Sequence, residues 1–427
     1  MMTARQKPNS APAAAETLSG TNLTRAGDYN QRVVLQAVRT SGIATRADLT
    51  AITGLTPPTV GNITARLLAD GLIRTDGHVT GGRGQPALKF TINPEGAFSL
   101  GLNIDRDHVT LVTMDLAGHI RDRASLESRF ALPDEVLSFV RSELRRIRRA
   151  RIIPAVGPTM GPADAQPDRL IGIGIGLPDD LGRIPLPRKP AAYDEWSRVD
   201  VCELFSRELD MPAYGENDAT AAAIGELQFG GGRGRQHFMF TLISAGLGSG
   251  IILSGQPYRG ASNSAGEIAF IARDLFAANS SNPATADGIL QDQVSLYALY
   301  DFLGERGIAA ASPDELDPND AACLSAAWEW VDMAVEALIG PFAVMNCAFN
   351  PEVHIIGGRL PRFIVERLCE RLNARLRQAI PHAPAVAPFI ASVAAEDAAP
   401  MGAAVLVFQN RLLPRLETLM KTFSDQS

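Results

Sequence analysis

Cysteine is scarce in this chain, and the four cysteines lie far apart in the sequence. Cys202, Cys323, Cys347 and Cys369 contain no pair at the short spacing of a zinc cluster. So few and so scattered cysteines also exclude a disulfide framework and are typical of a reducing compartment. We therefore expect no metal ion, no other cofactor and a cytoplasmic location.

Long apolar runs are also missing from the sequence. No uninterrupted apolar stretch reaches the roughly 18 residues that a membrane-spanning helix needs. The first 23 residues are rich in Ala, Ser, Thr and Asn, and they lack the apolar core of a signal peptide. We expect no membrane partner, and residues 1–25 are predicted to be a disordered tail.

The chain lacks an excess of positive charge, since its net charge is −7, which excludes a protein whose whole surface binds nucleic acid. The charge is unevenly spread, however. Residues 1–95 contain 10 Lys and Arg against 6 Asp and Glu (+4), and the rest contain 30 against 41 (−11). With 427 residues the chain can form two or three domains. A basic end on an acidic body predicts DNA binding confined to the N-terminal end.

Residues 45–71 have the pattern of a helix-turn-helix. Thr45 can cap a short helix, Asp48 suits its first turn, and Gly54 can end it in a left-handed conformation. Thr56 then caps a second helix, whose first turn tolerates the two prolines that follow. Two helices joined by a short turn that contains glycine form the motif that enters the major groove of DNA.

The second helix has an apolar face and a polar face. Residues at helical spacing form the apolar face: Val60, Ile63, Leu67 and Leu68. Thr59, Asn62 and Arg66 lie on another face and suit base edges and phosphates. The alternative is a helical pair that packs against a partner protein.

A glycine-rich segment follows the helices and resembles a wing. Residues 72–74 and 87–90 are predicted strands that flank residues 81–86, in which Arg83 lies between glycines. An arginine on so slender a loop can enter a narrow minor groove. The predicted DNA contacts are Arg46, Thr56, Pro57, Thr59, Asn62, Arg66, Arg83 and Gln85.

The remainder of the chain alternates predicted strands and helices. Residues 170–178 form a buried strand whose alternating glycines allow close approach of a ligand or a neighbouring strand. No helix follows them as a dinucleotide site requires. Asn217 and Asp218 end a strand and open a helix, so they either bind a ligand or cap the helix. The glycine-rich turn at 245–250 either cradles a phosphate or forms a tight hairpin.

The order of these motifs resembles the ROK family, which contains bacterial transcriptional repressors and sugar kinases. The resemblance extends from residue 30 to the last helix. The motifs that carry it are the helix-turn-helix, Gly82–Pro86, the strand ending at Pro178, Glu216–Ala219, Gly246–Gly255, Gly266–Ile268, Asn350–Pro351 and Gly357–Gly358.

The resemblance implies an α/β protein with a winged-helix N-terminal domain and a two-lobed, actin-like (ribonuclease H-like) sugar-kinase fold. Residues 26–95 would form the DNA-binding domain. Residues 96–217 would form the first lobe, which residues 399–427 complete, and residues 218–398 would form the second lobe. A cleft would separate the two lobes.

Departures from the family pattern argue against kinase activity. Asp105-Arg106-Asp107 stands where family kinases have a Gly-Gly-Thr phosphate loop, so the backbone cradle is lost and a second carboxylate would face the phosphates. Phe270 stands where the family has a sugar-binding histidine, and no Cys or His follows it before residue 296, so no zinc is expected. Asp218 matches the catalytic base of the family kinases, but we expect no catalytic residue.

These observations predict a DNA-binding transcriptional regulator, a repressor that acts as a homodimer or higher homo-oligomer on a double-stranded operator. A small ligand, a sugar or sugar derivative, would bind Asn217, Asp218 and Glu267 in the cleft. The alternatives are a ROK sugar kinase that carries a DNA-binding domain, and a regulator that acts by holding another protein.

Overall fold

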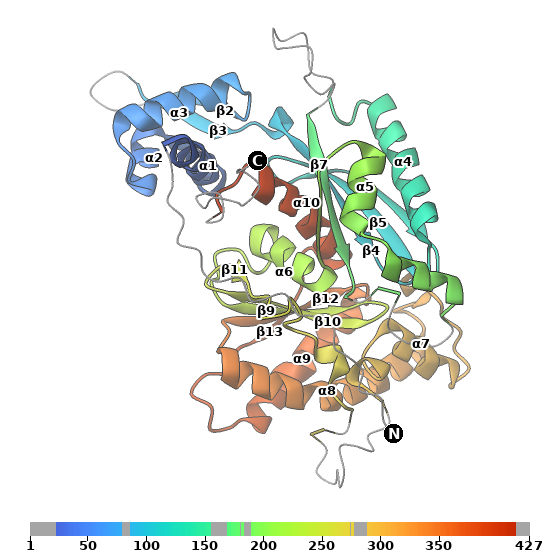
Figure 1. The fold of residues 1–427 in the computed structure, drawn as a ribbon. Helices are drawn as coiled ribbons and strands as arrows, with labels where there is room; N and C mark the ends of the chain where they lie inside the picture. The colour runs from blue at the N-terminus through green and yellow to red at the C-terminus, as the bar shows by residue number, and fades with distance from the viewer. Residues whose placement is uncertain are drawn as a thin grey trace, which may run out of the picture. The chain divides into compact units, whose positions relative to one another are not determined.

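The computed structural model (Figure 1) describes residues 23–78, 86–154, 169–179, 181–182, 189–273, 275–276 and 288–415. The chain divides into two compact units. The first ends at Ile92 and also takes in the segment that begins at Leu412, and the second is Asn93–Arg411. Helix α1 begins at Leu23, so the last three residues of the predicted tail are helical, and the rest of that tail lies outside the described residues.

The first unit combines three helices with a small antiparallel sheet in the order β1-β3-β2. Its elements are α1 (Leu23–Ser41), β1 (Ala44–Thr45), α2 (Arg46–Thr53), α3 (Pro57–Ala69), β2 (Ile73–His78) and β3 (Leu88–Ile92). Val34, Leu49, Val60, Leu67 and Phe90 are fully buried between the helices and the sheet. This apolar core holds α2 and α3 together as a helix-turn-helix.

The caps of α2 agree with the sequence prediction, and the cap of α3 differs from it. Thr45 and Asp48 form a reciprocal capping box, and Gly54 ends α2 with a φ of 68°. Thr56 occupies the N-cap of α3, but its hydroxyl does not cap the helix. The hydroxyl lies 2.9 Å from that of Thr59, because a side chain one turn along offers it a partner.

The second unit contains two five-stranded sheets with the same topology. The first lobe has the order β6-β5-β4-β7-β8, and the second has β11-β10-β9-β12-β13. In each sheet three antiparallel strands are extended by two parallel strands. The strands are β4 (Phe98–Ile104), β5 (His108–Asp115), β6 (Ile120–Glu127), β7 (Leu170–Leu177), β8 (Ala213–Asn217), β9 (Phe238–Ile243), β10 (Leu247–Leu253), β11 (Gln256–Pro257), β12 (Val353–Gly358) and β13 (Phe389–Ala391).

Helices cover both sheets of this unit (Figure 1). Two helices lie between the sheets, α6 (Asp218–Phe229) and α10 (Ala398–Arg411). The outer helices are α4 (Pro133–Arg149) and α5 (Val201–Leu209) on the first lobe, and α7 (Leu296–Gly304), α8 (Ala321–Phe349) and α9 (Arg362–Ala379) on the second. This repeated arrangement confirms the predicted two-lobed, actin-like fold.

Glycines allow α10 to pack directly on the first sheet. A Cβ added at Gly174 would lie 1.8 Å from the Ala403 carbonyl oxygen, and one at Gly101 would lie 1.9 Å from that of Pro400. The sequence predicted that the glycines of β7 admit a ligand or a neighbouring strand, but at Gly174 the close neighbour is the backbone of helix α10.

Helix α8 is long and apolar enough, with a mean hydropathy of 1.4, to pass for a membrane span by composition alone. Half of that stretch is buried inside the protein. Trp330, Leu338 and Phe342 belong to the core of the second lobe. The helix is therefore explained as the core helix of this lobe.

Candidate functional site

The predicted DNA-contacting residues of α3 lie on its outer face. Asn62 and Arg66 are exposed, as are Thr56 and Pro57 at the start of the helix, and Thr59 is half-buried. The apolar side chains on the opposite face contribute to the core, with Val60 and Leu67 fully buried. Helix α3 therefore presents short polar groups and one guanidinium to the outside.

Arg46, at the start of α2, is held in place by its neighbours. Its Nε donates to the Thr64 hydroxyl at 3.0 Å, and its guanidinium lies 5.4 Å from the centroid of the Phe90 ring. These contacts fix the arginine relative to α3 and β3. Arg83 and Gln85 of the predicted wing lie outside the described residues.

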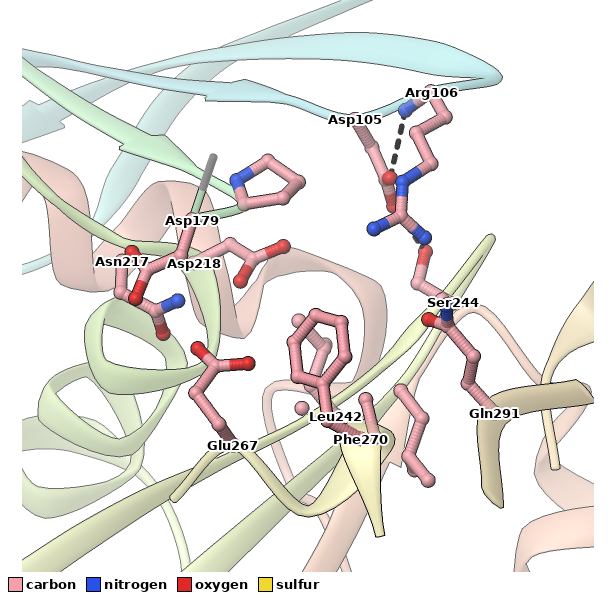
Figure 2. A pocket seen from close by; sticks show the side chains of 15 residues that line it. Asp105, Arg106, Asp179, Asn217, Asp218, Leu242, Ser244, Glu267, Phe270 and Gln291 are labelled. Atoms are coloured by element: carbon pink, nitrogen blue, oxygen red, sulfur yellow. Dashed lines mark hydrogen bonds between the residues drawn. The ribbon is translucent and has the colours of Figure 1, made fainter. Parts of the chain in front are cut away.

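A pocket that is open to solvent lies between the two lobes, at the ends of the central strands. Turns and helix starts from both sheets meet there, which is where α/β folds place ligands. Figure 2 shows the side chains around it. The polar residues of its lining are Asp105, Arg106, Asp179, Asn217, Asp218, Ser244, Glu267 and Gln291.

The three predicted effector-binding residues line this one pocket. Asn217 is also the N-cap of α6, and its Oδ1 accepts from the Thr220 amide at 3.0 Å. The Oδ1 of Asp218 accepts from the Ala219 amide at 2.7 Å. Capping and lining the pocket are thus compatible, because each side chain keeps a second polar atom for another partner.

Two carboxyl groups of the pocket hold their protons more tightly than usual. Burial raises the pKa of Asp218 to about 7, and the nearby Asp105 carboxylate adds to the effect. Burial likewise raises the pKa of Glu267 to about 8, helped by the hydrogen bond and the charge of Asp179. Near neutral pH these groups can therefore donate as well as accept hydrogen bonds.

We expect Asp218→Asn to flatten the pH dependence of stability. From about pH 4 to pH 7 the folded Asp218 keeps a proton that the unfolded carboxyl has lost, so stability falls as pH rises. Because asparagine does not titrate, the free energy of unfolding of the variant should fall less than that of the wild type over this pH range, by roughly 1 kcal/mol or more. Urea unfolding at both ends of this range measures it, with the exposed Asp301→Asn as control. Equal slopes for the wild type and Asp218→Asn would contradict the assignment.

The turn between β4 and β5 carries Asp105 and Arg106 into the pocket. The Asp105 carboxylate accepts from the Arg106 amide at 2.7 Å and from the Ser244 hydroxyl of the second lobe at 2.6 Å. The Arg106 guanidinium lies against the turn between β9 and β10, since a Cβ added at Gly246 would be 2.3 Å from Nη1. A cation therefore occupies the space between the two turns.

The expectation that Asp107 would face bound phosphates is wrong, because its side chain turns away from the pocket lining. Its carboxylate lies 2.7 Å from the His108 Nδ1 and 3.5 Å from the Arg359 guanidinium. Burial opposes ionisation, but the His108 hydrogen bond and the Arg359 charge lower the pKa of Asp107 overall. Arg359, which follows β12 in the second lobe, also binds Glu127 at 3.0 Å. The Asp107 carboxylate therefore helps to join the first lobe to the second.

Several pocket residues had not been predicted from the sequence. Asp179 follows Pro178 at the end of the glycine-rich strand, and that position could have indicated it. Ser244 and Gln291 carried no local signal, because they reach the pocket only when the second lobe packs against the first. Phe270 was expected at the site; it lines the pocket, and the residue is 47% exposed.

The duplicated sheets and the pocket between them define a two-lobed protein of the actin-like, sugar-kinase class. The chain belongs to the ROK family, whose family model matches residues 100–410.

Relatives within this family include both regulators and kinases. A xylose repressor of Caldicellulosiruptor bescii is 22% identical over 356 residues, which cover 80% of this chain and 86% of the repressor. A crystal structure of a ROK family transcriptional regulator, a homologue of the E. coli MLC protein, has a TM-score of 0.64 at 21% identity. It covers 90% of this chain and 96% of that one. A ROK family glucokinase from Streptomyces griseus, solved with glucose and AMPPNP, has a TM-score of 0.55 at 19% identity. The match covers 73% of this chain and 100% of the glucokinase.

Proposed function

We propose that this protein is a DNA-binding transcriptional regulator, a repressor, and that a small ligand in the pocket between its lobes controls it. The observation that carries the proposal is the helix-turn-helix of the first unit, in which the outer face of α3 exposes Asn62 and Arg66. A helix with this surface suits the major groove, where side chains contact base edges and phosphates.

The extent of the similarities supports the same proposal. The regulator structure covers 90% of this chain, whereas the glucokinase covers 73%. A regulator fold thus accounts for more of the chain than the kinase fold does. A repressor that acts on DNA in the cytoplasm, with two copies of α3 on two half-sites of a duplex, fits this organisation.

Selection of oligonucleotides by the full chain, followed by gel-shift titration, tests the proposal. We expect one enriched sequence with two related half-sites, bound at least about 1,000-fold more tightly than random duplex. The absence of any enriched sequence, or equal affinity for random duplex, would refute DNA recognition.

The ligand is expected to be a sugar or sugar derivative that contacts Asn217, Asp218 and Glu267. Carboxyl and amide groups suit hydroxyl-rich ligands because they bind several hydroxyls at once. A ligand that binds one arrangement of the lobes better shifts the population and changes DNA affinity. Calorimetry against a sugar panel tests this placement. It fails if Asp218→Ala leaves the affinity of a bound sugar unchanged.

Kinase activity is the second candidate, because Asp218 lies in the pocket with a pKa near neutrality, which suits a general base. We nevertheless expect no ATP-dependent phosphorylation of glucose, xylose or other common sugars. Arg106 occupies the space between the β4–β5 turn and the β9–β10 turn. In a kinase, backbone amides of an open loop would have to bind the nucleotide phosphates there. A coupled assay with ATP and magnesium measures this, and product above the no-enzyme background would favour the kinase.

A further inference from the structure

Arg106 is a buried cation whose guanidinium has no direct partner among the residues that the structure describes. The residue is 7% exposed, and its backbone amide, not its side chain, donates to Asp105. Within the described part of the chain the guanidinium makes no hydrogen bond and no ion pair. Removing an unpaired charge from water carries a large free-energy penalty. A buried arginine without a partner is therefore expected mainly where a ligand supplies the missing acceptor.

The guanidinium lies on the wall of the pocket, where a small ligand can reach it. Gly246 leaves it room, and the amide oxygen of Gln291 lies 3.3 Å from the position a Cβ at Gly246 would take. Gln291 itself is 8% exposed and lines the same pocket. The two side chains together offer a planar cationic donor and an amide donor on one side of the pocket.

The carboxyl groups of the pocket do not satisfy this cation. Asp105 is already bonded to Ser244 and to the Arg106 amide. Asp218 and Glu267 lie on the opposite side of the pocket from Arg106, as Figure 2 shows. Their raised pKa values leave Glu267 mostly protonated and Asp218 partly protonated near neutral pH, which weakens their ability to balance the arginine.

We propose that the ligand of this pocket carries an anionic group, a carboxylate or a phosphate, that binds Arg106. The hydroxyl groups at the other end of the ligand then reach Asp218 and Glu267, with the Phe270 ring between the two ends (Figure 2). The ligand is thus a sugar acid or a sugar phosphate and not a neutral sugar. This inference rests on the proposed function only in taking the pocket as the effector site.

The first test measures thermal stability of the full chain in inorganic phosphate and in acetate, each against chloride at equal ionic strength. The variants are Arg106→Gln and Arg106→Met, and the control is Arg145→Gln, which removes an exposed arginine of α4. We expect at least one anion to stabilise the wild type and the control more than either Arg106 variant. Comparing variants cancels the general stabilising effect of phosphate. Equal responses of all proteins, or no stabilisation of the wild type beyond chloride, would overturn the inference.

The second test separates carboxylate from phosphate by calorimetry with glucose, glucuronate and glucose 6-phosphate. We expect the wild type to bind one charged sugar at least about ten-fold more tightly than glucose, and Arg106→Gln to lose this preference. Glucose that binds as tightly as both charged sugars would refute the proposal. Gel shifts with the same proteins report on DNA binding independently, so failure of the anion site and failure of the regulator are distinguished.

Discussion

We expect the double variant Asn62→Ala, Arg66→Ala to bind the selected operator about 100-fold more weakly than the wild type. An asparagine that contacts a base edge contributes about 1–3 kcal/mol of discrimination, and a phosphate contact adds to it. Both side chains are exposed on α3 and lie away from the apolar core, so their removal should not unfold the first unit.

The two single variants should differ in kind. Asn62→Ala should lower affinity for the operator more than for random duplex, because base contacts carry specificity. Arg66→Ala should weaken binding to the operator and to random duplex alike. It should also reduce the slope of log affinity against log salt concentration by about 1. The control is Asn319→Ala with Arg149→Ala, which removes two exposed side chains of the second unit. Unchanged operator affinity of the double variant would refute the assignment of α3 as the recognition helix.

The variant Glu226→Ala should destabilise the second unit strongly, by about 3 kcal/mol or more. Glu226 is fully buried near the end of α6. Its carboxylate accepts from the Gly231 amide at 2.5 Å, the Ser392 hydroxyl at 2.5 Å, and the amides of Val393 and Ala394 at 3.0 Å. Alanine would leave the buried Ser392 hydroxyl and three partly buried amides without this acceptor.

Urea unfolding followed by circular dichroism measures this loss as a fall in the midpoint. Glu226→Gln keeps one acceptor oxygen and most of the volume, so its loss should be intermediate. Glu195→Ala, which removes an exposed glutamate, should change the midpoint little. A midpoint for Glu226→Ala equal to that of the control would show that the four hydrogen bonds do not stabilise the unit.

The prediction from sequence was best where local chemistry decides the structure. The capping box at Thr45 and the left-handed Gly54 limit α2 through contacts within a few residues, so a short segment contains the whole signal. The alternating glycines of β7 indicated a close neighbour, but the neighbour at Gly174 is helix α10 and not the predicted ligand or strand. At the site, the sequence indicated Asn217, Asp218 and Glu267, which the structure brings to one pocket.

The direction of side chains in the turn between β4 and β5 could not be predicted in this way. Asp105-Arg106-Asp107 indicated a lost phosphate loop, but the structure sends Asp107 toward Arg359 and Arg106 into the pocket. Arg359 is more than 250 residues away in sequence. No local periodicity or spacing encodes which of two adjacent side chains will meet so distant a partner.

Residue order alone was thus sufficient for the helix-turn-helix and the polar face of α3, because both depend on spacing or capping among near neighbours. The two-lobed fold was indicated by the order of motifs that resembles the ROK family. Packing of the lobes was needed to bury Arg106, which has no partner in the described part of the chain, and to gather the four donors around Glu226. These features depend on burial, and burial arises only when segments far apart in the chain come together and exclude water.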